Sequence, residues 1–197
     1  MRIEAVVVLL LAVLVVLFIV FPKPAPVVSE TAAKNFVLED MQTKYPAADE
    51  WEILSVDHNS TTSSGTPSYA IKGAVVINLK SVCPERYHLY YDYPKSNFVT
   101  WTETITSHCE VCNGQASCVI AFPEEVVIAS YKLAGSTRVS DYISSYPDAK
   151  PTVQFLDSTE DGMTNVWRVQ WVSPSASYAL VAYVSKANGS VLKVTSA

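Results

Sequence analysis

The chain carries one short pattern twice, and this repeat constrains its fold more than any other feature. Lys44-Tyr45-Pro46-Ala47-Ala48 recurs as Ser145-Tyr146-Pro147-Asp148-Ala149. Each Tyr-Pro pair follows a segment whose apolar residues recur at helical spacing, and each proline is expected to end the helix. Because internal similarity indicates repeated structural units, the sequence predicts two units of similar architecture.

Each unit begins with a predicted helix that has one apolar face. The apolar positions are Leu38, Met41 and Tyr45 in the first helix and Val139, Tyr142, Ile143 and Tyr146 in the second. Ser29 and Ser136 are the expected N-caps, since a serine side chain accepts hydrogen bonds from the first helical turn. Such helices bury their apolar face against a partner, here the strands that follow.

Segments with strand periodicity follow each Tyr-Pro pair. The alternation is clearest at Trp167, Val169 and Trp171, as in an antiparallel strand buried on one side. A hairpin closes each unit, and Asn188-Gly189 is a strong turn signal because both residues tolerate positive φ. Between the units, residues 123–134 are predicted to be helical, with Pro123 in the first turn and Gly135 as the stop. A buried strand is the alternative for this segment.

The N-terminus contains an unbroken apolar segment from Ala5 to Phe21. A helix of this length covers roughly 25 Å, at the lower end of what crosses a bilayer. A cleaved secretory signal is the alternative, but the flank from Pro22 to Pro26 does not resemble a cleavage site. We predict a single-pass anchor over residues 1–22, membrane contact through residues 5–21, a Pro-rich spacer over residues 23–28 and a body outside the cytoplasm.

The predicted fold class is therefore α+β, with an N-terminal transmembrane helix followed by two repeated units, each a helix packed on an antiparallel sheet of about four strands. The first unit is expected over residues 29–107. A cysteine-rich insertion follows over residues 108–122, and residues 123–197 hold the linking helix and the second unit.

The four cysteines are Cys83, Cys109, Cys112 and Cys118. If the first hairpin turns at Lys95-Ser96, the numbers of paired residues sum to about 191, which places Cys83 opposite residue 108, beside Cys109. Two disulfides, most simply Cys83 to Cys109 and Cys112 to Cys118, suit a domain outside the cytoplasm. Sequence cannot choose among the three pairings, and a Cys₄ zinc site built on the Cys109-x-x-Cys112 spacing is the alternative. A redox pair at Cys109 and Cys112 is a third interpretation.

Charge and motif content exclude several functions. The net charge is −5 with a pI near 5.2, and basic residues do not cluster, so we expect no nucleic-acid partner. The chain has no nucleophile elbow, phosphate-binding loop or dinucleotide fingerprint. We therefore expect no catalytic activity and no cofactor other than zinc as the alternative.

The tyrosine-rich segment around residues 87–93 is the candidate binding surface. Alternation places Tyr87, Leu89, Tyr91 and Tyr93 on one strand face and His88, Tyr90 and Asp92 on the other. One interpretation is aromatic packing under the helix, and the other is an exposed patch, centred on Tyr90, for a peptide or glycan. The sequons at Asn59 and Asn188 are candidate glycosylation sites.

The helix ending in Tyr146-Pro147-Asp148-Ala149, the alternating strand around Trp167 and the hairpin from Tyr183 to Leu192 resemble a PepSY-type domain, which has a cystatin-like fold. The first unit is a weaker copy. The resemblance implies tandem domains that bind or regulate a protein or peptide partner in the cell envelope, and it supplies no catalytic residues. We expect a membrane-anchored extracytoplasmic binding or regulatory module. The alternative is a metal- or thiol-dependent envelope protein centred on the four cysteines.

Overall fold

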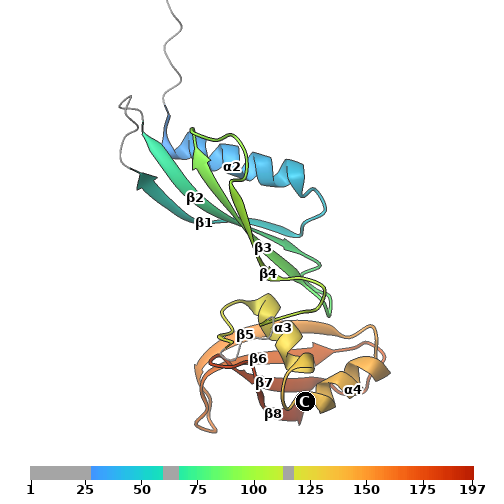
Figure 1. Ribbon diagram of the computed structural model, residues 1–197. Coiled ribbons are helices and arrows are strands. Elements are labelled where there is room, and N and C mark those ends of the chain that lie inside the picture. Colours follow the sequence, from blue (N-terminus) through green and yellow to red (C-terminus); the bar gives the residue numbers. More distant parts are fainter. Residues whose placement is uncertain (1–27, 60–66, 113–117) are drawn as a thin grey trace, which may run out of the picture.

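The computed structural model describes residues 28–59, 67–112 and 118–197. These residues form two antiparallel sheets of four strands and three helices, arranged as two units (Figure 1). No helix in the described residues has the length and apolar character needed to cross a membrane. The transmembrane helix predicted over residues 1–22 lies outside the described residues, so membrane contact through residues 5–21 stays a prediction.

The first unit is one helix on one sheet. It comprises α2 (Glu30–Lys44), β1 (Glu50–Asn59), β2 (Ser68–Ile77), β3 (Glu85–Tyr93) and β4 (Trp101–Thr106), and the strands pair in chain order. Helix α2 lies across one face of the sheet (Figure 1) and buries Ala33, Val37 and Met41, which recur every fourth residue. As predicted, Ser29 caps α2: its Oγ accepts a hydrogen bond from the Ala32 N–H at 3.1 Å.

The second unit carries two helices. It comprises α3 (Pro123–Lys132), α4 (Thr137–Ser145), β5 (Lys150–Ser158), β6 (Thr164–Val172), β7 (Leu180–Ser185) and β8 (Val191–Ser196), again paired in chain order. Its core contains the fully buried Trp171, whose indole N–H donates to Ser130 Oγ on α3 at 3.2 Å. The Trp167 indole N–H donates to the Ile120 carbonyl at 3.2 Å, which ties the segment before α3 to the sheet.

The predicted fold class requires correction, because the two units in the described residues are not equivalent helix-on-sheet repeats. Helix α3 contacts β5, β6 and β7, whereas α4 contacts mainly α3 and β7. The counterpart of α2 is α4, which has 9 residues against 15. Nine helical residues span about 14 Å, whereas a strand of nine residues spans about 30 Å. The linking helix α3 covers the remaining sheet, so the helical prediction there is confirmed and the buried strand is wrong.

The two Tyr-Pro segments nevertheless leave their helices by the same turn. The Tyr45 N–H donates to the Met41 carbonyl at 2.9 Å, and the Ala48 N–H donates to the Tyr45 carbonyl at 3.1 Å. Residues 146 and 149 make the corresponding bonds at 2.9 and 3.0 Å. The sequence repeat therefore marks a shared helix end rather than a fully shared unit.

Two local predictions also differ from the structure. Ser136 occupies the N-cap of α4 but makes no side-chain capping bond, because its φ of −85° and ψ of −5° are helical and a capping residue needs extended backbone. In the first hairpin, strand β4 begins only at Trp101, several residues after the predicted turn at Lys95-Ser96. The N–H and the hydroxyl of Thr100 both donate to the Tyr90 carbonyl at 2.8 Å, which fixes where pairing starts.

The second hairpin turns at Asn188-Gly189, as predicted. Gly189 has a φ of +71°, and a Cβ there would lie 2.6 Å from Leu133 Cδ1 just after α3. Glycine provides both the positive φ and the space for this approach. The turn thereby packs the β7–β8 hairpin against the end of α3.

Candidate binding surface

The register of the first sheet places charged and aromatic side chains on the face that α2 does not cover, here called the outer face. Three complete rows cross it from β1 to β4, and two of them lie in its middle. One contains Ser55, Lys72, Tyr90 and Trp101, and the other contains Glu52, Ala74, His88 and Glu103. The row that contains Asp57, Ala70 and Asp92 crosses three strands at one end of the face, and Glu50, Val76, Arg86 and Thr106 form the row at the other end.

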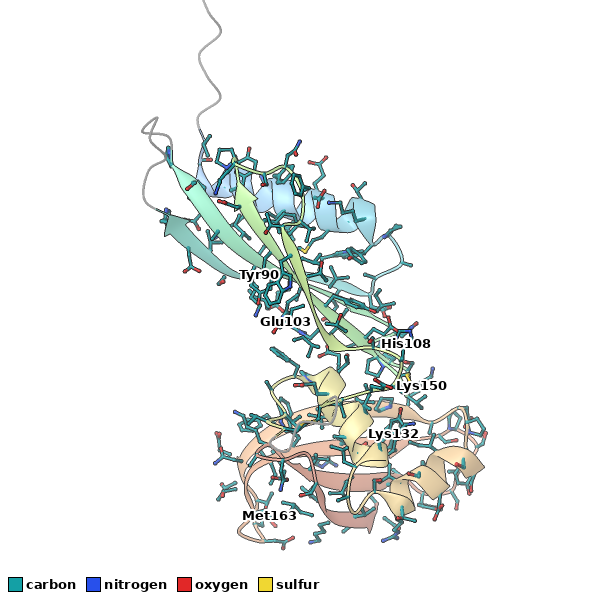
Figure 2. All side chains as sticks on the ribbon, viewed as in Figure 1. Tyr90, Glu103, His108, Lys132, Lys150 and Met163 are labelled. Atoms are coloured by element: carbon teal, nitrogen blue, oxygen red, sulfur yellow. A yellow bond between two sulfur atoms is a disulfide. The ribbon has the colours of Figure 1, made fainter. Side chains whose placement is uncertain are left out.

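An aromatic pair, the half-buried Tyr90 and the exposed Trp101, lies on β3 and β4 of the outer face. The rings of Tyr90 and Trp101 have centroids 4.6 Å apart, and Trp101 is 57% exposed. The Tyr90 hydroxyl donates to Glu103 Oε2 at 2.8 Å, and Figure 2 shows these two side chains next to each other on the sheet. Glu103 thus fixes the Tyr90 ring, on which Trp101 rests.

Glu103 is the acceptor around which this part of the face is organised. Its Oε2 also lies 3.2 Å from His88 Nδ1 and 3.5 Å from Lys72 Nζ. The Tyr90 hydrogen bond, with smaller contributions from His88 and Lys72, holds the pKa of Glu103 below its usual range. The carboxylate is therefore charged at neutral pH and keeps its three partners oriented.

A groove of about 490 Å³ opens beside the aromatic pair. The outer-face side chains that line it include Asp57, Ala70, Lys72, Tyr90 and Asp92. Ala70 lies between two aspartates in its row, and its methyl group leaves space there. The groove therefore combines carboxylates, an aromatic wall and access to solvent.

The opposite end of the outer face is covered by the second unit. Arg86 and Glu124 form an ion pair at 3.4 Å with both side chains almost wholly buried. The Arg86 guanidinium also lies over the Phe122 ring, 4.4 Å from its centroid, and its Nε–H donates to His88 Nε2 at 3.1 Å. Burial raises the pKa of Glu124 and lowers the pKa of His88. This end of the face joins the units, and its Val76, Arg86 and Thr106 side chains are closed to a partner, whereas Glu50 is exposed.

A second pocket, of about 320 Å³, lies at this junction between α3, β5 and the loop after β2. Its lining is mainly apolar, from residues such as Leu79, Val127 and Val153. Its buried polar group is Glu124, which is already paired with Arg86. The groove on the outer face is therefore the better candidate for recognition by polar groups.

The structure joins Cys83 to Cys109 and Cys112 to Cys118, with Cα atoms 4.9 and 5.3 Å apart. The β3–β4 register follows the predicted sum of 191 from Tyr90 to Tyr87 and then shifts by one residue at a bulge before Arg86. That shift accounts for Cys83 meeting Cys109 rather than residue 108. A Cys₄ zinc site would need the same four sulfur atoms as thiolates and stays an alternative prediction.

The tyrosine segment divides between the two faces as its alternation indicated. On the helix side, the Tyr91 hydroxyl donates to Asp40 at 2.9 Å and Tyr93 packs on Phe36, so these residues belong to the core. Tyr90 and Asp92 line the groove. His88 was predicted on the same exposed surface and requires correction: it is 1% exposed, because Phe122 packs against its ring.

Sequence reasoning missed Glu103, although the predicted hairpin register already paired residue 103 with residue 88. Of the candidate glycosylation sites, Asn188 is exposed, and its Oδ1 accepts hydrogen bonds from the Ser190 N–H and hydroxyl at 3.1 and 2.8 Å. Asn59 ends β1, and the rest of its sequon lies outside the described residues.

Comparison with protein-family models, with curated proteins and with solved structures finds no match to this chain. The resemblance to PepSY-type domains therefore stays a prediction from the sequence.

Proposed function

We propose that this protein is an extracytoplasmic binding module without catalytic activity, and that a protein or peptide partner in the cell envelope docks on the outer face of the first sheet. The Tyr90–Trp101 pair beside the groove, with its exposed indole, carries the proposal. A large indole that is more than half exposed contributes little to the core, whereas aromatic side chains are the commonest anchors of protein interfaces.

The support around this pair favours binding over accidental exposure. Glu103 accepts a hydrogen bond from the Tyr90 hydroxyl, so the aromatic pair is already oriented before a partner binds. A pre-oriented surface loses less conformational entropy on association than a mobile one. The two disulfides stabilise the chain near the end of this sheet and support a location in an oxidising compartment.

The proposal is tested by asking whether the protein forms a complex with a partner in the cells that make it. We would compare the apparent mass of the gently extracted full chain with that of Trp101→Ala and of a control, Leu192→Ala, which removes another exposed apolar side chain on β8. We expect the wild type and Leu192→Ala to have the apparent mass of a complex and Trp101→Ala to have the apparent mass of the single chain. A wild-type chain that runs alone, or a Trp101→Ala variant that keeps the complex, would overturn the proposal.

A further inference from the structure

The free end of the outer face has two carboxylates on either side of a hollow. Asp57 on β1 and Asp92 on β3 are both in register with Ala70 on β2. Neighbouring strands lie about 4.8 Å apart, so the two aspartate backbones are separated by roughly 10 Å. The hollow over Ala70 therefore has room for one partner side chain that would contact both carboxylates.

Negative charge is in excess over the whole outer face. Its acidic residues are Glu50, Glu52, Asp57, Asp92 and Glu103. Of the basic residues, Lys72 turns toward Glu103 and Arg86 is buried against Glu124. In the described part of the chain, no basic group lies within salt-bridge distance of Asp57 or Glu50. Lys95 pairs with Asp92 at 3.2 Å but is 71% exposed, so a partner can displace it at little cost.

On the basis of the proposed function, we propose that the partner presents an extended segment bearing Lys or Arg. One cationic side chain occupies the groove between Asp57 and Asp92, and a second residue about four positions along the segment lies on Trp101. The spacing follows from the sheet. Ala70 on β2 and Trp101 on β4 are two strands apart, about 10 Å, and their rows are two residues apart along the strands, about 7 Å. The direct distance is therefore about 12 Å, which an extended chain covers in about four residues.

The negative charge of the outer face favours a cationic segment over a neutral glycan as the ligand. Both would stack on an aromatic shelf, and both would hydrogen-bond to carboxylates, which act only as acceptors. Only a cation gains from the surplus negative charge, which attracts it over a distance and speeds encounter. A guanidinium on the Trp101 face adds a cation–π contribution that a sugar does not make.

The probe is a pair of synthetic peptides, acetyl-Gly-Arg-Ser-Gly-Ser-Arg-Gly-amide and its twin with citrulline, the neutral isostere, at both arginine positions. Calorimetric titration of the full-length protein should show the arginine peptide binding at least about tenfold more tightly than its twin. This difference should shrink between roughly 20 mM and roughly 300 mM salt, because the groove is exposed and its charges are screened.

Matched variants locate the binding. The double variant Asp57→Asn/Asp92→Asn should weaken the arginine peptide by about tenfold or more, whereas Asp157→Asn, which removes an exposed carboxylate on the second unit, should not. Equal affinity for both peptides, no binding of the arginine peptide, or full affinity in the double variant would overturn the inference.

A third probe separates this inference from the proposed function. If chitotetraose binds and Trp101→Ala abolishes that binding, the outer face is a glycan site and the cationic segment is wrong. If the arginine peptide does not bind but Trp101→Ala still abolishes the complex extracted from cells, the proposed function as a binding module is retained and only the partner class is wrong. If Trp101→Ala leaves the cellular complex intact, the proposed function itself fails.

Discussion

Arg86 of the first unit and Glu124 of the second form an ion pair at the junction, and the two residues are only 6% and 3% exposed. Removing one member of a buried pair leaves an uncompensated charge, which typically costs about 3–5 kcal/mol, whereas replacing both by apolar residues is often neutral. We expect Arg86→Met and Glu124→Leu each to lower the free energy of unfolding by about 3 kcal/mol or more. The double variant should recover most of this loss in urea denaturation. Losses that simply add would show that the pair does not couple the units.

The hydrogen-bond pattern fixes the protonation of His88. Because Arg86 donates to Nε2, that nitrogen is unprotonated, and Nδ1 carries the hydrogen that faces Glu103. Burial, together with the charges of Lys72 and Arg86, lowers the pKa of His88 against the opposing effect of Glu103. The folded state therefore binds fewer protons here than the unfolded state, and this group destabilises the protein as pH falls below the unfolded value of about 6.5.

We accordingly expect the free energy of unfolding to fall between about pH 7.5 and about pH 5.5, and His88→Gln to reduce that slope. A glutamine amide can accept from Arg86 and donate to Glu103 without titrating. The raised pKa of Glu124 acts in the opposite direction, because its stabilising contribution is greatest at low pH and is lost as pH rises through its folded pKa. Identical pH slopes in the wild type and His88→Gln would contradict the assignment.

The two disulfides predict a specific change on reduction. The mass of the denatured protein should rise by about 4 Da, two hydrogens for each bridge. Unchanged mass together with bound zinc would instead favour the Cys₄ site. On a chain-entropy basis, the Cys83–Cys109 bridge should contribute about 3.5 kcal/mol and the shorter Cys112–Cys118 loop about 2.4 kcal/mol. Serine pairs at each bridge, compared by chemical denaturation, should rank in that order.

Gly73 lies on β2 directly under α2, where a Cβ would stand 2.6 Å from Met41 Sδ. Gly73→Ala overpacks this contact and should cost about 1–3 kcal/mol. Met41→Ala leaves a cavity at the same place and should cost about 2–5 kcal/mol. Because the added methyl fills part of that cavity, the double variant should lose less stability than the sum of the two. Additive losses would show that the residues are not in contact.

The sequence predicted local structure better than the assembly of the units. The Ser29 cap, the Asn188-Gly189 turn and the α3 helix depend on neighbouring residues, so their signals are readable in the chain. Helix α3 is the main cover of the second sheet because α4 is too short to span it. The repeated Tyr-Pro pairs mark only where the helices end and do not indicate their lengths. The burial of His88 could not be predicted from the sequence either. Phe122, which packs on the His88 ring, is distant in the sequence and meets the sheet only in the folded chain.

The candidate surface shows the same division. Strand alternation separated Tyr90 and Asp92 from Tyr91 and Tyr93, since side chains on neighbouring positions face opposite sides. The groove itself arises from the small Ala70 between two aspartates on different strands, and this requires the β1–β2 register. That register includes a shift between Ile53 and Ser55, and the alternation of apolar and polar residues does not predict such a shift.

The most direct measurement is photo-crosslinking from position 101 in the cells that make the protein, with a photoreactive phenylalanine analogue in place of Trp101. The control carries the same analogue at Leu192, which is 53% exposed on β8. If the outer face is the binding surface, position 101 yields a discrete crosslinked product that position 192 does not. No product from position 101, or the same products from both positions, would contradict the assignment of this face to a partner.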